Sequence, residues 1–380
     1  MGKGISRRDM LKIPTVAAGA LAIAGMTPGT SRAAQEQSGG STAGAVVPPL
    51  RPIRADEMRI TFLGTSFLPR TAQECNSVYV EVGSGDQFIF DCGSGVVAKY
   101  NAMGIPYSKM DKIFLTHLHG DHTSDLIHIY AFGPSGDRKT PLQVWGPSRS
   151  NMRNPSTGEN PDDGVKAFFE AFQTMMSWHV QGFSFLQTGV GPRGSGQNGY
   201  DLAVTELDWT DRSLPLIYDK NGTQIRYFPA AHDRNGSISY KLTYNGMSMI
   251  FTGDTKPNDY VTTHGKGVDV LIHEMVVPPE TWVEKNAGLK PGQDGYNEAL
   301  KIAQDVQDSS HTPQKAFGYI MSQTKPRLAV VTHFQVNSDT TGPALRDIRY
   351  WYRGPVVFAT DLLVLTVSPK RIVQQRALID

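Results

Sequence analysis

Short apolar runs that end in polar residues recur along the chain from Met58 onward, separated by segments rich in Gly, Pro, Asn and Asp. Runs of this kind, bounded by turn residues, are typical of β-strands. In the first half, the pattern predicts strands at residues 58–66, 76–82, 86–95, 112–117 and 141–147. In the second half, it predicts strands at residues 223–232, 237–246, 247–254, 268–274, 327–334 and 356–367. Two strand-rich halves, each with late helices, predict an α/β fold in which two sheets pack together with helices outside.

Helical periodicity of apolar positions predicts helices at residues 96–104, 164–180, 297–307 and 312–324. The second of these segments carries much aromatic bulk between Phe168 and Trp178. Two interpretations are open: the helix packs on the core, or it overhangs a pocket and supplies Phe, Met and Trp side chains to its walls. In the second case, the Gly-, Pro- and Asn-rich residues 146–164 would shape the same pocket.

The N-terminal residues differ in character from the rest. Adjacent arginines in Ser6–Lys12 precede an apolar run, Ile13–Met26, that is too short to span a bilayer as a mature anchor. Small residues then offer a cleavage site after Ala33. The pattern resembles a twin-arginine export signal, which implies recognition by the twin-arginine machinery and export of the folded protein to the periplasm or beyond. No membrane anchor is expected after cleavage. We therefore predict a signal peptide at residues 1–33, a flexible linker at 34–57 and one domain at 58–380.

Charge and cysteine content narrow the possible partners. The 380 residues carry a formal net charge of +1, and no Lys/Arg-rich patch with interleaved aromatic residues occurs, so a nucleic-acid partner is not expected. Two cysteines, Cys75 and Cys92, cannot form a disulfide framework. We predict that they are small core residues rather than a bridged pair.

Candidate metal ligands are most concentrated in the six residues from His117 to His122, at the end of a predicted strand. His117 and His119 can point the same way in an extended loop, and Gly120 allows a sharp turn before Asp121 and His122. Imidazole and carboxylate groups together suit Zn, Mn or Fe. Four such ligands so close in sequence cannot all close on one ion without strain, whereas two ions that share a bridging carboxylate can use them.

Partner ligands are expected at strand ends in the second half, because loops can gather them into one site. His232, Asp254 and His333 each lie at the end of a predicted strand. A lone histidine at such a position is more often structural than metal-bound. Together with the histidine cluster, however, these three residues complete a ligand set for two ions.

The stretch Thr116–His122 is similar to the HxHxDH signature of the metallo-β-lactamase superfamily. Further motifs occur in the order seen in the ribonuclease Z and arylsulfatase-like branch: Leu63–Ser66, Phe90–Gly95, Phe251–Thr255, Leu271–Glu274, His311–Ala316 and Val330–Phe334. The resemblance covers residues 58–367 and implies a hydrolase domain with the four-layer αββα sandwich of this superfamily.

The resemblance also implies a set of ligands for two divalent ions, expected to be Zn²⁺, with Mn or Fe also compatible. One ion would be held by His117, His119 and His232. The second would be held by Asp121, His122 and His333, and Asp254 would bridge both.

Three further residues match supporting positions of the branch. Asp91 would be the aspartate that orients a ligand. Glu274 and His311 would form a proton-relay pair, although His311 also fits the start of a surface helix. The implied mechanism is attack of metal-bound hydroxide, oriented by Asp121, on a phosphorus, sulfur or carbonyl centre. His311 would protonate the leaving oxygen.

Two segment lengths and one motif bear on the substrate. Only residues 233–253 separate His232 from Asp254, too few for the long arm of a transfer-RNA processing nuclease. Residues 275–310, in contrast, form a longer segment than is usual for the branch. It begins with Met275-Val276 where Ala-Thr follows the Glu in ribonuclease Z-like members.

We therefore predict an exported dinuclear metal-dependent hydrolase that cleaves a small phosphodiester, an aryl sulfate or a related small-molecule ester. A ribonuclease Z-type phosphodiesterase is the alternative enzyme. A non-hydrolytic metal-binding protein or a di-iron redox protein is the alternative of another class. Glu274 and His311 favour hydrolysis, because a binding protein requires no acid for a leaving group. Members of this branch are often dimers, so a homodimer is the assembly to consider.

Overall fold

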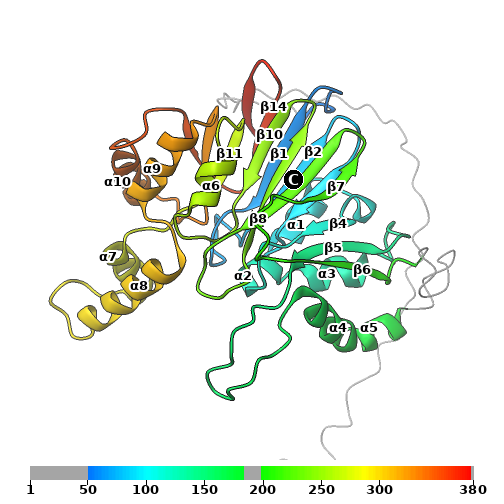
Figure 1. Cartoon of the computed structure of the whole chain (residues 1–380), viewed down its shortest axis with the longest axis horizontal. Helices are drawn as coiled ribbons and strands as arrows, with labels where there is room; N and C mark the ends of the chain where they lie inside the picture. The colour runs from blue at the N-terminus through cyan, green and yellow to red at the C-terminus, as the bar shows by residue number, and fades with distance from the viewer. Residues whose placement is uncertain (1–49, 184–197, 378–380) are drawn as a thin grey trace, which may run out of the picture. The chain divides into compact units, whose positions relative to one another are not determined.

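The strands pair into two sheets in the computed structural model, which describes residues 50–183 and 198–377 (Figure 1). In sheet order, the eight strands of the first are β15 (Ile372–Arg376), β14 (Leu363–Val367), β1 (Met58–Gly64), β2 (Ser77–Val82), β3 (Gln87–Phe90), β4 (Lys112–Phe114), β5 (Leu142–Pro147) and β6 (Leu202–Leu207). The seven strands of the second are β13 (Val356–Phe358), β12 (Leu328–Thr332), β11 (Val270–Glu274), β10 (Met247–Phe251), β9 (Ile238–Tyr244), β8 (Thr223–Pro229) and β7 (Leu216–Lys220). The predicted signal peptide and residues 34–49 of the predicted linker lie outside the described residues.

The alternation of side chains along each strand explains why the two sheets stack. On β1, Ile60 and Phe62 lie in the core between the sheets, whereas Leu63 lies in the cluster on the opposite face. Phe251 of β10 meets Phe90 of β3 across the core, with ring centroids 6.1 Å apart. Each such fully buried side chain contributes roughly 1.5–3 kcal/mol of transfer free energy before conformational entropy is subtracted.

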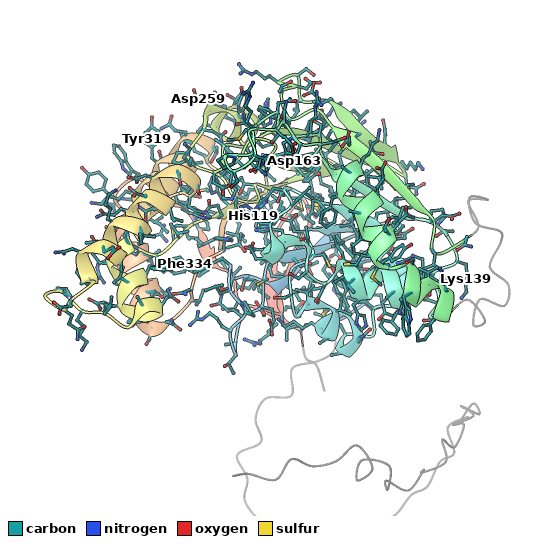
Figure 2. The ribbon with its side chains drawn as sticks, turned by 90° about the horizontal axis from the view of Figure 1, so that it is seen from below. His119, Lys139, Asp163, Asp259, Tyr319 and Phe334 are labelled. Carbon is teal, nitrogen blue, oxygen red and sulfur yellow. The ribbon has the colours of Figure 1, made fainter. Side chains whose placement is uncertain are left out.

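Helices cover the outer face of each sheet. On the first sheet lie α1 (Val96–Ala102), α3 (Leu126–Phe132), α4 (Val165–Met175) and α5 (Ser177–Gly182), packed through one apolar cluster. On the second lie α6 (Asp259–His264), α9 (Gln314–Thr324) and α10 (Ser338–Ile348), packed through another. The layers therefore run helix, sheet, sheet, helix, which confirms the predicted αββα sandwich. In the view of Figure 2, His119 lies near the middle, with Tyr319 of α9 to one side and Lys139 to the other.

A separate segment precedes His311. It consists of α7 (Pro279–Trp282), the π-helical turn η4 (Val283–Ala287) and α8 (Tyr296–Ser310), and we call residues 279–310 the α7–α8 segment. Figure 1 shows it on the same side of the sheets as α9 and α10, and away from α4 and α5. Val283, Tyr296 and Ala303 form its own small apolar cluster, so its position does not depend on the main core alone.

Several elements differ from the sequence prediction. The predicted helix 164–180 divides near Met176 into α4 and α5. The strands predicted at 86–95 and 112–117 end earlier, at Phe90 and Phe114, because the chain leaves the sheet to form the site described below. The prediction also missed β6, β7 and β15, each of which is an edge strand of its sheet.

Two simpler expectations concern single features. Cys75 and Cys92 are both buried and both free, as predicted for core residues. Among the described helices, none is both long enough and apolar enough to cross a membrane.

Candidate metal centre

The centre begins where the chain leaves β3. Asp91 is fully buried and has a left-handed backbone conformation, with φ of 57°. Its carboxylate accepts hydrogen bonds from the backbone N–H of Thr116 at 2.8 Å and from the Thr116 hydroxyl at 2.7 Å. It also accepts from Nδ1 of His122 at 2.6 Å. Because Nδ1 is engaged in this way, Nε2 of His122 is left to face the centre, which is how carboxylates orient metal-binding histidines.

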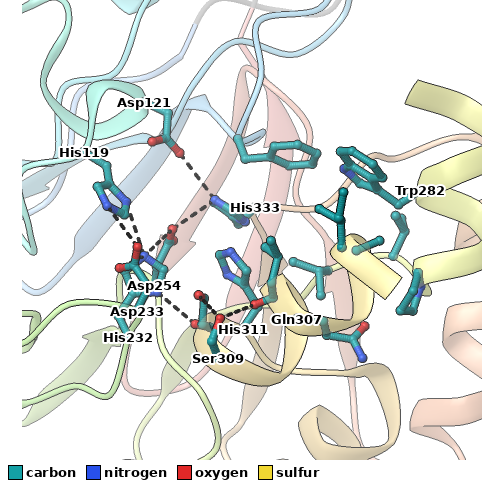
Figure 3. Close-up of a pocket in the computed structure, with 18 residues that line it drawn as sticks. His119, Asp121, His232, Asp233, Asp254, Trp282, Gln307, Ser309, His311 and His333 are labelled. Atoms are coloured by element: carbon teal, nitrogen blue, oxygen red, sulfur yellow. Dashed lines mark hydrogen bonds and ion pairs between the residues drawn. The ribbon is translucent and has the colours of Figure 1, made fainter. Parts of the chain in front are cut away.

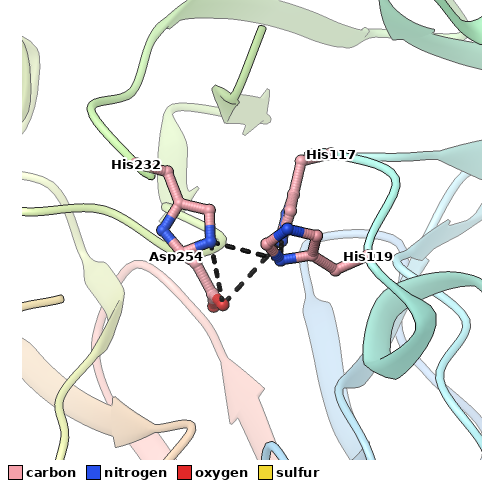
Figure 4. A group of neighbouring side chains, drawn as sticks. All are labelled: His117, His119, His232 and Asp254. Carbon is pink, nitrogen blue, oxygen red and sulfur yellow. Dashed lines mark hydrogen bonds and ion pairs between the residues drawn. The ribbon is translucent and has the colours of Figure 1, made fainter. Parts of the chain in front are cut away.

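The first group of ligand atoms comes from the loop after β4 and from two loops of the second sheet. It consists of His117, His119, His232 and Asp254 (Figure 4). Nδ1 of His119 lies 3.0 Å from Nε2 of His117 and 3.3 Å from Nε2 of His232. Oδ2 of Asp254 lies 3.8 Å and 3.9 Å from those two Nε2 atoms, respectively. Three imidazole nitrogens and one carboxylate oxygen therefore converge on one point.

The second group shares Asp254 with the first. Nε2 of His122 and Nε2 of His333 lie 3.3 Å and 3.1 Å from Oδ2 of Asp254. Oδ2 of Asp121 lies 3.2 Å and 3.4 Å from the same two nitrogens. His333, which follows β12, has φ of 58°, a left-handed conformation uncommon for a residue other than glycine. Backbone strain of this kind clusters at functional sites.

These residues fit a pair of metal ions. Within each group, the ligand atoms all lie within 4.8 Å of one another. The second carboxylate oxygen of Asp254, Oδ1, is buried and has no hydrogen-bond partner among the described residues. A buried acceptor of this kind is costly unless something satisfies it. Imidazole nitrogens and carboxylate oxygens in these proportions suit Zn²⁺ and also suit Mn or Fe.

The charges at the centre depend on one another. Burial alone would raise the pKa of Asp254, but His333 and His122 beside it hold that pKa well below its ordinary value. Burial would lower the pKa of His333, but Asp254 and Asp121 raise it to about 10. His117 has fewer carboxylates beside it, so burial and the neighbouring His122 lower its pKa well below the ordinary value.

Glu274 and His311 lie together beside the second group. Nδ1 of His311 donates to Oε1 of Glu274 at 3.0 Å, and that oxygen also accepts from the backbone N–H of Thr255 at 3.0 Å. The His311 ring stacks on the His333 ring, with centroids 5.0 Å apart. Burial opposes protonation of His311, but the Glu274 carboxylate raises its pKa above the ordinary value.

All the residues predicted as ligands or as the relay pair thus lie in one place, and two neighbours were not predicted. The backbone carbonyl of Ser310, the last residue of α8, accepts from Nδ1 of His232 at 2.9 Å and so directs its Nε2 to the first group. A backbone carbonyl leaves no signal in the sequence. Asp233 lies 3.6 Å from Nε2 of His119 and 3.4 Å from Nε2 of His232. Its place next to His232 in the chain could have suggested it.

A cavity of about 410 Å³ opens beside the ligands, and its far wall differs from the prediction (Figure 3). Phe169 and Phe172 of α4 are buried against the first sheet, and Trp178 of α5 is 82% exposed outside the cavity. The expectation that this aromatic segment and residues 146–164 shape the pocket is therefore wrong. The α7–α8 segment lines the cavity instead.

Known proteins support the assignment of the fold. Residues 58–136 match the family model of the anti-Pycsar protein Apyc1. Ribonuclease Z from Mycobacterium marinum is 27% identical over 230 residues, covering 58% of this chain and 71% of that enzyme. The metallo-β-lactamase fold protein YhfI from Bacillus subtilis aligns with a TM-score of 0.56 at 15% identity, over 82% of this chain and all of YhfI. Human short-form tRNase Z aligns with a TM-score of 0.54 at 19% identity, over 80% of this chain and 98% of that enzyme. The chain therefore has the metallo-β-lactamase fold, and ribonuclease Z enzymes are among its relatives in sequence.

Proposed function

We propose that this protein is a dinuclear metal-dependent hydrolase that cleaves small phosphodiesters. The observation that carries the proposal is the pair of ligand groups that share Asp254. The sequence relationship to ribonuclease Z supports phosphoester chemistry in particular. The ligand set favours Zn²⁺, and Mn or Fe remain alternatives for a metal analysis.

When bound, two metal ions supply Lewis acidity, which lowers the pKa of a water molecule and neutralises charge on phosphoryl oxygens. The protein's own residues then supply orientation and protons. Asp121, which lines the cavity, can accept a hydrogen bond from the attacking water and orient it. A buried centre also limits the reorganisation of solvent around the reacting groups.

The leaving oxygen needs a proton as its bond to phosphorus breaks. His311 lines the cavity, and Glu274 occupies its Nδ1, so Nε2 is the nitrogen that can donate. The raised pKa of His311 keeps it protonated at neutral pH more fully than a free imidazole. A general acid in this position is worth about 10²–10⁴-fold in rate.

Cleavage of precursor transfer RNA is the second candidate, because a ribonuclease Z is similar in sequence. The stretch between His232 and Asp254 argues against this candidate. All of it is described, and the β9–β10 hairpin occupies it, which leaves no room for the long arm of a transfer-RNA processing nuclease. The proposed export by the twin-arginine route, based on Ser6–Lys12, would also separate the protein from transfer RNA. Aryl sulfates and related esters remain substrates to test, because they present similar tetrahedral oxygens.

The test is a hydrolysis panel on purified, metal-loaded protein. It contains bis(4-nitrophenyl) phosphate, 4-nitrophenyl sulfate, a lactone, a cephalosporin and a precursor transfer RNA. We expect the phosphodiester to be the best small substrate and Asp254→Ala to have no detectable turnover. The exposed Asp259→Ala serves as the matched carboxylate control and should keep full activity. A fully active Asp254→Ala variant, or a wild-type protein that leaves every diester intact, would contradict the proposal.

A further inference from the structure

The cavity beside the ligands has two chemically different sides. Asp121, His232 and Asp254 lie on one side, and Trp282 lies on the other, with His311 between them (Figure 3). At about 410 Å³, the cavity is in the range of small-molecule sites. It is much larger than the reacting phosphoryl group requires, so the space beyond His311 is available to the rest of a substrate.

The far side is apolar and belongs to the α7–α8 segment. Ile302 and Val306 are one helical turn apart on α8, and they line the cavity together with Trp282. Their exposed fractions are 55% and 50%, although both are aliphatic. Phe67, from the loop after β1, lines the cavity as well. Adjacent exposed apolar side chains around a concave site mark a surface that binds apolar groups.

The same helix is tied to the metal ligands. The Ser310 carbonyl at its end holds Nδ1 of His232, and the next residue is His311, held by Glu274. We call Trp282, Ile302 and Val306 the apolar wall. The helix that carries Ile302 and Val306 thus also holds the metal ligand His232 in place. A molecule anchored on the ligands therefore meets Val306 and Ile302 in a defined position.

The cavity has no Lys or Arg side chain among its described lining residues, and three of those residues are aspartates. Lys285 of the segment is paired with Asp339 at 2.7 Å and does not line the cavity. A substrate with further phosphate groups beyond the scissile bond would find no counter-charge there, whereas an uncharged apolar group would.

We propose that the substrate of this site is an amphipathic ester: its anionic head binds at the metal ligands, and an aromatic or aliphatic group packs against Trp282, Ile302 and Val306. The proposal rests on the hydrolase function proposed above and defines its substrate class. Burial of each methylene against such a wall strengthens binding about fourfold.

The test measures binding, so that it does not depend on turnover. Methyl-, butyl- and hexylphosphonate are titrated calorimetrically into the metal-loaded full chain. Wild-type protein should bind each longer chain more tightly, by about fourfold per methylene until the wall is covered. The double variant Ile302→Ser/Val306→Ser should lose at least tenfold in hexylphosphonate affinity and keep the methylphosphonate affinity.

Met175→Ser provides the matched control, because Met175 is 59% exposed on α4, outside the cavity. It should bind the series as wild-type protein does. Circular dichroism and metal content establish that the double variant is folded, and Val306→Ser alone replaces it if it is not. Affinity independent of chain length in wild-type protein, or the same dependence in the wall variant, would overturn the proposal.

The experiments also distinguish dimer formation at the apolar wall from ligand binding, and ligand binding from hydrolysis. If a second copy of the chain covers this wall, sedimentation will show a dimer that the double variant dissociates, with no change in hexylphosphonate affinity, and the proposal falls. Chain-length-dependent binding without hydrolysis of any ester would support the apolar site and contradict only the hydrolase function.

Discussion

The helical segments α4–α5 and α7–α8 both lie outside the sheets, but one packs on the core and the other lines the cavity. Both carry apolar side chains at helical spacing. In α4, Phe169 and Phe172 are buried against the first sheet. In α8, Ile302 and Val306 remain half exposed and line the cavity. Apolar side chains at helical spacing therefore form core in α4 and a cavity wall in α8, and the spacing alone does not distinguish the two.

The largest expected effect distinguishes two histidines: His311, directly after the α7–α8 segment, and His179, on α5. His311 follows α8 and lines the cavity, whereas Nε2 of His179, on α5, donates to the backbone carbonyl of Ala131 at 2.9 Å and lies outside the cavity. His311→Ala should lower kcat for the phosphodiester by about 10²–10⁴-fold. His179→Ala should leave kcat unchanged. Steady-state kinetics with equal metal content in both variants will decide, and equal losses would remove the distinction.

For stability, we expect the larger effect in α4 and the smaller one in α8. Phe169→Ala removes a side chain that is 1% exposed and should lower the free energy of unfolding by about 3–5 kcal/mol. Val306→Ala removes two methyl groups from a half-exposed position and should change it by about 0.5 kcal/mol or less. Urea unfolding followed by circular dichroism measures both. If Val306→Ala were the more destabilising, α8 would belong to the core and not to the site.

Metal removal should affect only one of the two segments. The bond from His232 to the Ser310 carbonyl links α8 to the ligands, whereas the ligand groups include no residue of α4. Chelation should therefore reduce protection of the α8 amides by roughly 1 kcal/mol, the worth of one hydrogen bond, and leave α4 unchanged. Hydrogen exchange with mass spectrometry reports both helices in one experiment. Equal changes in α4 and α8 would mean that the metals stabilise the whole fold.

The smallest effect concerns the loop that leads into α4. Asp163 accepts from the backbone N–H of Ser150 at 2.8 Å and from Nε of Arg234 at 2.9 Å. Burial opposes the charge of Asp163, but Ser150 and Arg234 lower its pKa below the ordinary value. A lowered pKa stabilises the folded state above the unfolded-state pKa of about 4, and the benefit disappears as pH falls through the folded-state value.

Asp163→Asn should thus cost about 1 kcal/mol or less at pH 7, because both charged partners are partly exposed. The difference from wild type should shrink as pH falls below about 4. Thermal unfolding across pH measures it. A difference that grows on acidification would show that the charge of Asp163 does not stabilise the loop.

The sequence predicted the centre better than it predicted the wall, for a physical reason. Metal ligation demands particular side chains, so His117, Asp254 and His333 stand out at strand ends even though they lie far apart in the chain. An apolar wall demands only apolar side chains. Ile302 and Val306 therefore have the same spacing as a core-facing stripe, and only the position of α8 shows that they face a cavity.

The strands follow the same logic. Central strands such as β11 and β12 are buried along their whole length, and each contains a continuous apolar run, Val270–Ile272 and Leu328–Val331. The missed strand β15 lies at a sheet edge, where exposed Gln and Arg side chains dilute the pattern. The orientation of His232 by a backbone carbonyl could not be predicted, because that interaction depends on the fold and not on a side chain.

The central claim is that Asp254 joins two metal sites into one catalytic centre. Native mass spectrometry of the purified full chain, loaded with Zn²⁺ and then freed of excess ion, tests it most directly. The account predicts two ions for each wild-type chain and for Asp259→Ala, and fewer than two for Asp254→Ala. A wild-type chain that holds at most one ion, or an Asp254→Ala variant that still holds two, would contradict it.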